Sequence, residues 1–144
     1  TRARSEQNPQ DWFAQSMEGI KELTSECDKS QVAGISFGGQ MHGLVVLDKD
    51  DQVIRPAILW NDGRTAKEAD YLNQVIGKDK LSEYTANIAF AGFTAPKILW
   101  MREHEPENYA KIAKIMFQRL FGVSVVRNIL YRYVGCIGNA SHGR

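Results

Sequence analysis

The sequence has little of several features that mark specialised classes of protein. Its two cysteines, Cys27 and Cys136, lie far apart and do not make a disulfide framework, which fits the reducing cytoplasm. No apolar run approaches the roughly 20 residues of a membrane-spanning helix, and the first residues lack the apolar core of a signal peptide. The net charge of +1 gives no general attraction to nucleic acid or anionic membranes. Neither is therefore expected as a partner.

What the chain does contain is the composition of a globular domain. Hydrophobic residues make up 43% and charged residues 24% of the 144 positions, both ordinary values for a globular protein with a core. That length suits about one domain. Apolar runs typical of strands alternate with stretches of helical periodicity, and this alternation favours an α/β fold.

The first helix is expected to begin at Asn8 and Pro9. Asparagine caps the free backbone N–H groups of a helix, and proline suits its first turn. The apolar residues that follow recur at helical spacing and predict a stripe that faces the core. The stripe consists of Trp12, Phe13, Met17, Ile20 and Leu23.

Further elements are expected after residue 64. A helix is predicted over about 65–76, with Gly77 as its stop. Thr94 is expected to cap another helix, Pro106 to begin a third, and residues 115–116 to form a strand. The inward-facing residues of the 65–76 helix would be Ala66, Ala69, Leu72, Val75 and Ile76.

The stretch 32–64 organises the rest of the chain. Its apolar runs, 32–37, 44–47 and 57–60, predict strands that are separated by a glycine pair and a polar turn. Residues able to hydrogen-bond a polyol follow the first run and end the last one. If the strands are neighbours, these ends converge on one site. The polyol-binding candidates are Gln40, His42, Trp60, Asn61, Asp62 and Arg64.

The segment GISFGGQMHGLVVLD followed by PAILWNDGRT resembles the N-terminal domain of the FGGY carbohydrate kinases, most of all those that phosphorylate D-xylulose. GQMHG and WNDGR at this separation are a fairly specific pair. The resemblance implies the ribonuclease H-like fold of actin and hexokinase. It also implies that residues 1–116 are an incomplete N-terminal domain, an internal piece without the family's first β-hairpin and its phosphate loop.

The resemblance further implies part of a cytoplasmic, ATP-dependent kinase that converts D-xylulose to D-xylulose 5-phosphate. The intact enzyme would use ATP and Mg²⁺ and is compatible with a homodimer, whereas this chain is not expected to bind either cofactor tightly. The family's catalytic aspartate lies outside the chain, so no catalytic or metal-binding residue is assigned and the isolated chain is expected to be inactive. A kinase for ribulose, gluconate, glycerol or another polyol, and a non-catalytic sugar-binding relic, are the alternatives.

Two of the site residues match family positions that contact the substrate. Met41 would supply an apolar wall and His42 a hydrogen bond to a sugar hydroxyl. The ring of Trp60 would stack on the sugar or lie in the core. Asp62 and Arg64 would reach the sugar or hold each other and their loop. The complete set of expected substrate-binding residues is Gln40, Met41, His42, Trp60, Asp62 and Arg64.

The glycine pair Gly38-Gly39 is not expected to cradle ATP. It lacks the further glycines, the lysine and the helix of a phosphate loop. We interpret it as a source of backbone freedom beside the sugar site.

The resemblance stops at about Phe117. Read one base further along, codons for Gly135–Arg144 can encode DASGMLLMD, and those for Arg119–Asn128 can encode DYLVYRL and, after one mismatch, Gly. Both correspond to segments of the family, LPRDYLVYRLTG and SDASGTLLFDV. We therefore hypothesise a frameshift near 116–119, so that residues 117–144 form a tail that packs poorly; a divergent C-terminus is the alternative.

Overall fold

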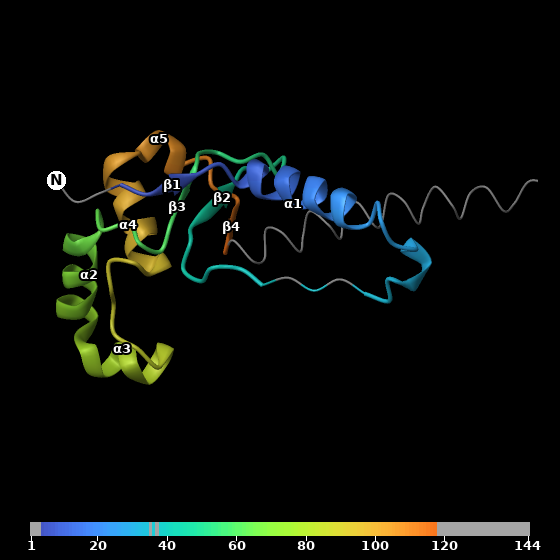
Figure 1. The fold of residues 1–144 in the computed structure, drawn as a ribbon. Coiled ribbons are helices and arrows are strands. Elements are labelled where there is room, and N and C mark those ends of the chain that lie inside the picture. The colour runs from blue at the N-terminus through green and yellow to red at the C-terminus, as the bar shows by residue number, and fades with distance from the viewer. Residues whose placement is uncertain (1–3, 35, 37, 118–144) are drawn as a thin grey trace, which may run out of the picture.

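Two pairs of short antiparallel strands lie at the centre of the structure, a computed structural model that describes residues 4–34, 36 and 38–117 (Figure 1). β1 pairs with β3, and β2 pairs with β4. Leu44 and Ile58 connect the two pairs through backbone hydrogen bonds of 2.9 and 3.2 Å. The strands are β1 (Glu6–Gln7), β2 (Val45–Leu47), β3 (Ala57–Ile58) and β4 (Lys114–Met116).

Helices account for most of the remaining regular structure, and their alternation with the strands confirms the α/β prediction. Figure 1 shows α2 and α4 beside each other, while α1 leads away from the strands. The helices are α1 (Pro9–Leu23), the 3₁₀ turn η1 (Lys29–Gln31), α2 (Ala66–Leu72), the π-helix η2 (Asn73–Gly77), α3 (Lys78–Thr85), α4 (Thr94–His104) and α5 (Pro106–Tyr109).

The core occupies both faces of β2. Side chains alternate along a strand, so Leu44 and Val46 pack on one face with Ile58 and with Trp100 and Met101 of α4. The opposite face is formed by a second buried group, against which Trp12 of α1 and Met116 pack. That group consists of Val45, Leu47, Ala57 and Leu59.

α1 begins where the sequence predicts. The side chain of Asn8 accepts a hydrogen bond from the backbone N–H of Gln10, and Pro9 occupies the first turn. The expected core-facing stripe is wrong at its far end, because Leu23 is 78% exposed. Among the described residues, Trp12 near the start of α1 packs against the buried strand residues. Periodicity thus identified the apolar face of α1 but not the surface that would cover its far end.

Two predictions for the later helices need correction. α2 ends at Leu72 and continues as the π-helix η2, in which Val75 is 63% exposed instead of facing inwards; Ile76 is exposed too. Gly77 does break the helix, with φ of 89°, but α3 follows directly. Thr94 is the first residue of α4 and not its cap, because the extended residue Phe93 occupies the cap position. The Thr94 hydroxyl donates to the carbonyl of His42.

The strand predictions hold only in part. Residues 44–47 and 57–60 contain β2 and β3, and the predicted strand at residues 115–116 is β4. The described residues of the run 32–37 contain no strand. The helix expected at Pro106 is α5.

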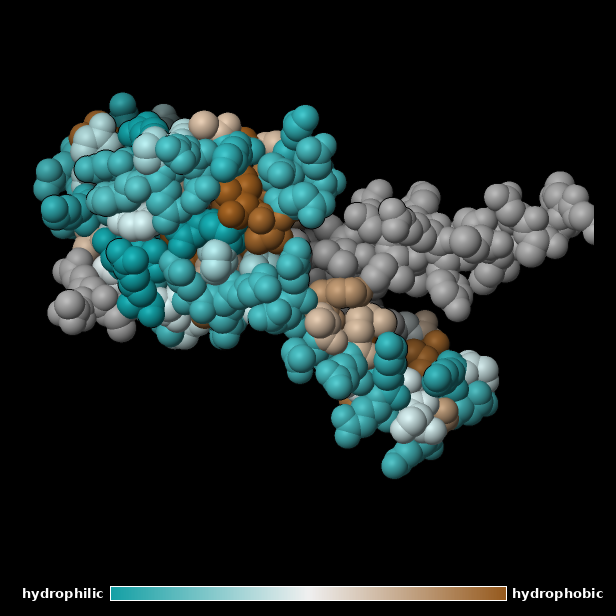
Figure 2. Space-filling model, turned by 90° about the horizontal axis from the view of Figure 1, so that it is seen from above, coloured by the Kyte–Doolittle hydropathy of each residue, from teal (hydrophilic) through white to brown (hydrophobic). Residues whose placement is uncertain are grey.

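Figure 2 shows the molecule from above, relative to the view of Figure 1. This face is mainly hydrophilic, and its hydrophobic residues lie in small groups. Among the described residues, no helix combines the length and the apolar character needed to cross a membrane. Apart from Phe117, the hypothesised tail 117–144 lies outside the described residues.

Candidate functional site

His42 lies just before β2 in a backbone conformation that is uncommon for a side-chain-bearing residue. Its φ of 67° falls in the left-handed region, which costs free energy for any residue except glycine. Its ring stacks on Phe93, with centroids 4.2 Å apart and planes 17° from parallel. Conformations of this kind often occur at functional sites, where the surrounding structure holds them in place.

Lys97 of α4 supplies much of that hold. Its side chain is fully buried, and its Nζ donates to the carbonyls of His42 and Gly92 at 2.7 Å each. The Thr94 hydroxyl donates to the same His42 carbonyl at 3.3 Å. Burial lowers the pKa of Lys97 to about 8, with nearby Asp62 acting against that shift. The first turn of α4 thus fixes the backbone beside Met41 and His42.

Gly92 connects this loop to the segment that contains Trp60. A Cβ atom at Gly92 would lie 2.4 Å from the carbonyl oxygen of Trp60, so only glycine fits without a shift. The Gly92 carbonyl also accepts from Lys97, so one amino group bonds the backbones of His42 and Gly92 while the Trp60 carbonyl packs against Gly92.

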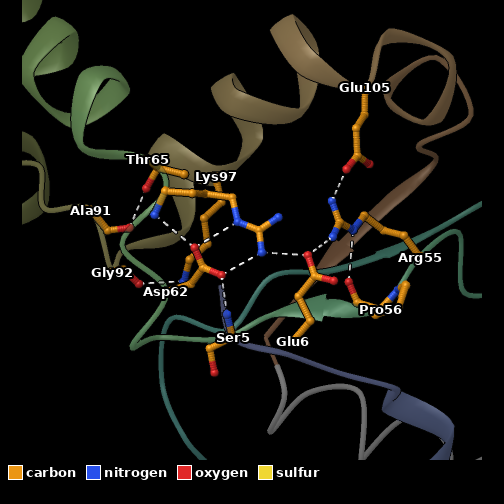
Figure 3. Close-up of polar contacts among 11 residues, drawn as sticks. Ser5, Glu6, Arg55, Pro56, Asp62, Thr65, Ala91, Gly92, Lys97 and Glu105 are labelled. Carbon is orange, nitrogen blue, oxygen red and sulfur yellow. Dashed lines mark hydrogen bonds and ion pairs between the residues drawn. The ribbon is translucent and has the colours of Figure 1, made fainter. Parts of the chain in front are cut away.

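Asp62 and Arg64 hold each other, and Figure 3 shows Asp62 with its partners. The Asp62 carboxylate is 1% exposed and accepts from the Arg64 guanidinium at 2.7 and 2.9 Å. It also accepts from the backbone N–H groups of Ser5, at 2.7 Å, and Arg64. Burial alone would raise the pKa of Asp62, but these hydrogen bonds outweigh it and lower the pKa.

The pair belongs to a longer ionic network that ties β1 to the helices. Arg64 bridges Glu6 at 2.6 Å, and Arg55 bridges both Glu6 and Glu105 (Figure 3). The Arg64 guanidinium also lies 4.8 Å from the Trp100 ring, in cation–π range. These contacts support one of the two roles expected for Asp62 and Arg64, that of holding the loop. A contact of either with a sugar stays a prediction.

The six predicted site residues therefore divide into an exposed and a buried group. Gln40 is exposed, and so are Met41 at 72% and Trp60 at 52%; His42 is half-buried. Their side chains are available to a ligand, whereas those of Asp62 and Arg64 are enclosed. Trp60 is not in the core, which leaves stacking as its other predicted role.

Sequence reasoning missed Lys97, Gly92 and Phe93. A usable signal existed for Lys97: it precedes Met101 by four residues, so it shares the core face of α4 with that buried methionine. Gly92 could not be found, because its constraint comes from a carbonyl 32 residues away in sequence.

The glycine pair does not fit a phosphate-binding loop. The segment after Gly39 leads into the strand β2 and not into a helix, whose N-terminus would provide backbone N–H donors. No step involving ATP is therefore assigned to these residues.

Comparisons with known proteins identify the family to which this chain is similar. The model of the FGGY family of carbohydrate kinases, N-terminal domain, matches residues 1–125. The chain is 47% identical over 117 residues to the xylulose kinase of Bacillus subtilis (strain 168), and 42% identical over 115 residues to that of Staphylococcus xylosus. Both alignments cover 80% of this chain.

A solved structure agrees with these matches. The crystal structure of the Brucella ovis protein described as a xyloylose kinase superposes with a TM-score of 0.76 at 38% identity, covering 82% of this chain and 25% of that one. The chain spans about a quarter of the length of the curated relatives it matches, 23% and 24% for the two above.

Proposed function

Because the chain belongs to the FGGY family of carbohydrate kinases, we propose that it forms one wall of the sugar site in a cytoplasmic kinase that phosphorylates D-xylulose. Identities of 42% and 47% to proteins named xylulose kinase support this substrate. The observation that carries the proposal is the held conformation of His42 beside the exposed Met41.

The chain's own contribution would be to bind and orient the sugar. Met41 offers an apolar surface to the carbon chain, and the imidazole of His42 a hydrogen bond to a hydroxyl. Trp60 has an exposed ring for stacking. Lys97 is fully buried and donates to the backbone carbonyls of His42 and Gly92, so we assign it the role of positioning the loop and not of binding the substrate.

The reaction itself requires groups beyond these residues. ATP supplies the phosphoryl group and Mg²⁺ neutralises its charge, while a carboxylate accepts the proton of the attacking hydroxyl. We propose that the sites for ATP and Mg²⁺, the carboxylate base and any homodimer contact belong to the intact enzyme. Asp62 is not proposed as the base, because its carboxylate is enclosed and occupied by Ser5 and Arg64.

Sugar binding by the isolated chain tests the proposal. D-xylulose should raise the melting temperature in proportion to its occupancy of the folded state, and ATP should not. Met41→Ala should reduce the shift, while Leu23→Ala, at a comparably exposed residue outside the site, should keep it. Absence of any response to D-xylulose, or an equal response in Met41→Ala, would count against the proposed site.

A second variant separates binding from backbone strain. His42→Gly removes the imidazole and also the cost of the left-handed φ. The variant loses the stack on Phe93 and gains relief of the left-handed φ, so its melting temperature should stay close to that of the parent. It should also lose the response to D-xylulose. Kinase activity of the pure 144-residue chain above a mock preparation would contradict the assignment of catalysis to the intact enzyme.

A further inference from the structure

A cluster of three potential metal ligands lies outside the sugar site, between α2 and α4. One ligand atom from each of Glu68, Glu103 and His104 lies within 4.8 Å of the other two. Glu68 belongs to α2, and the other two residues end α4. These helices contact each other, so the arrangement rests on the fold and not on a flexible loop.

The state of Glu68 is the observation that points to a ligand. Its side chain is buried at 6% exposure, and its Oε2 has no hydrogen-bond partner among the described residues. A buried carboxylate oxygen without a partner is costly. Lys67 and Arg102 line the same groove, yet neither forms an ion pair with Glu68 or Glu103 in the described structure.

The contacts of the His104 ring leave one of its nitrogens available to a ligand. Its Nδ1 lies 3.1 Å from the backbone carbonyl of Trp100, and the ring stacks on the indole of that residue at 4.9 Å. A carbonyl acceptor selects the Nδ1–H tautomer, which leaves the lone pair on Nε2. Metal-binding histidines usually have such an outer partner.

We propose that Glu68, Glu103 and His104 form a binding site for a divalent transition-metal ion, with Zn²⁺ as the best match. One imidazole and two carboxylates fit the three protein ligands of an open zinc site, and two negative charges balance the ion. Donor atoms around tetrahedral zinc lie about 3.3 Å apart, given bonds of about 2.0 Å. The exposed side chains of Glu103 and His104 would therefore move towards Glu68 on binding.

Titration calorimetry of the 144-residue chain with ZnCl₂ tests the site. Glu103→Gln and His104→Gln should each weaken one zinc equivalent at least tenfold, while Glu107→Gln, an equally exposed acid on α5, should leave it unchanged. The triple variant E68Q/E103Q/H104Q measures zinc held elsewhere, for instance by Cys27. Equal affinity in the parent, Glu103→Gln and His104→Gln would overturn the proposal.

Glu68→Gln adds a readout that a purely structural role would not give. Without metal the variant should melt at a higher temperature than the parent, because a neutral amide replaces a buried carboxyl group whose Oε2 has no partner among the described residues. It should also lose the zinc-induced rise in melting temperature that the parent shows. A zinc-induced rise of the same size in the parent and Glu68→Gln would overturn the site. The experiment contains no sugar, so its outcome is independent of the proposed kinase function.

Discussion

Lys97 is a buried lysine whose amino group serves two backbone carbonyls at once. The folded chain holds its pKa at about 8, below the ordinary 10.5. Between these values the unfolded chain binds more protons than the folded chain, so the free energy of unfolding rises with pH. A neutral amine still has two N–H groups, enough for both carbonyls. Deprotonation therefore relieves the buried charge without breaking the contacts.

We expect the Lys97→Met variant to lose this pH dependence. In urea unfolding at pH 7 and pH 9.5, the parent should gain about 1 kcal/mol relative to the variant, after allowance for solvent screening. Lys111→Met, at an exposed lysine, should track the parent. A parent and Lys97→Met that respond identically to pH would mean that Lys97 titrates normally in the folded chain.

At the scale of elements, the contact between Gly92 and the Trp60 carbonyl joins the segment before α4 to the segment after β3. Gly92→Ala should destabilise the fold by about 1–3 kcal/mol, because its Cβ would meet a backbone atom at 2.4 Å. Gly19→Ala is the matched control: nothing lies within 4 Å of its Cβ, and alanine favours a helix interior by about 0.5–1 kcal/mol. Urea denaturation should therefore give shifts of opposite sign, and equal shifts would show that the segment can move.

Local sequence signals predicted the elements well where the cause is local. Asn8 and Pro9 located the start of α1, and Pro106 that of α5, because capping and fixed φ act within one turn. The predictions that Leu23 and Val75 face the core were wrong, because burial also requires a second surface and periodicity carries no information about it. The prediction of Thr94 as a cap was wrong because α4 begins at Thr94 itself, with Phe93 in the cap position.

At the scale of the whole molecule, motifs identified the family but could not divide the roles of the candidate residues. GQMHG and WNDGR carried the resemblance to a family that the comparisons then showed. Asp62 and Arg64 had two open roles, and the contacts of the pair with Ser5 and Glu6, more than 50 residues earlier, could not be predicted from the motif. Lys97 has the same dependence on tertiary structure, since its acceptors come from two other segments.

The last question at this scale is whether residues 117–144 belong to the domain at all. We propose that they come from a shifted reading frame, since one shift recovers two family-like segments. The curated relatives described above align over 115 and 117 residues, while the family match extends to residue 125. A tail without selected contacts adds no cooperative stability.

Truncation after Phe117 should therefore leave the melting temperature within about 2 °C of the parent, well below the 4–8 °C that a loss of about 1 kcal/mol causes in a small domain. Restoring the frame by a single-base deletion near codons 116–119 should instead raise the melting temperature, because DYLVYRL would supply the apolar pattern that the family uses there. DNA sequencing across those codons gives the direct answer. An uninterrupted frame, together with a truncation that lowers the melting temperature by several degrees, would show that the tail is a genuine part of the fold.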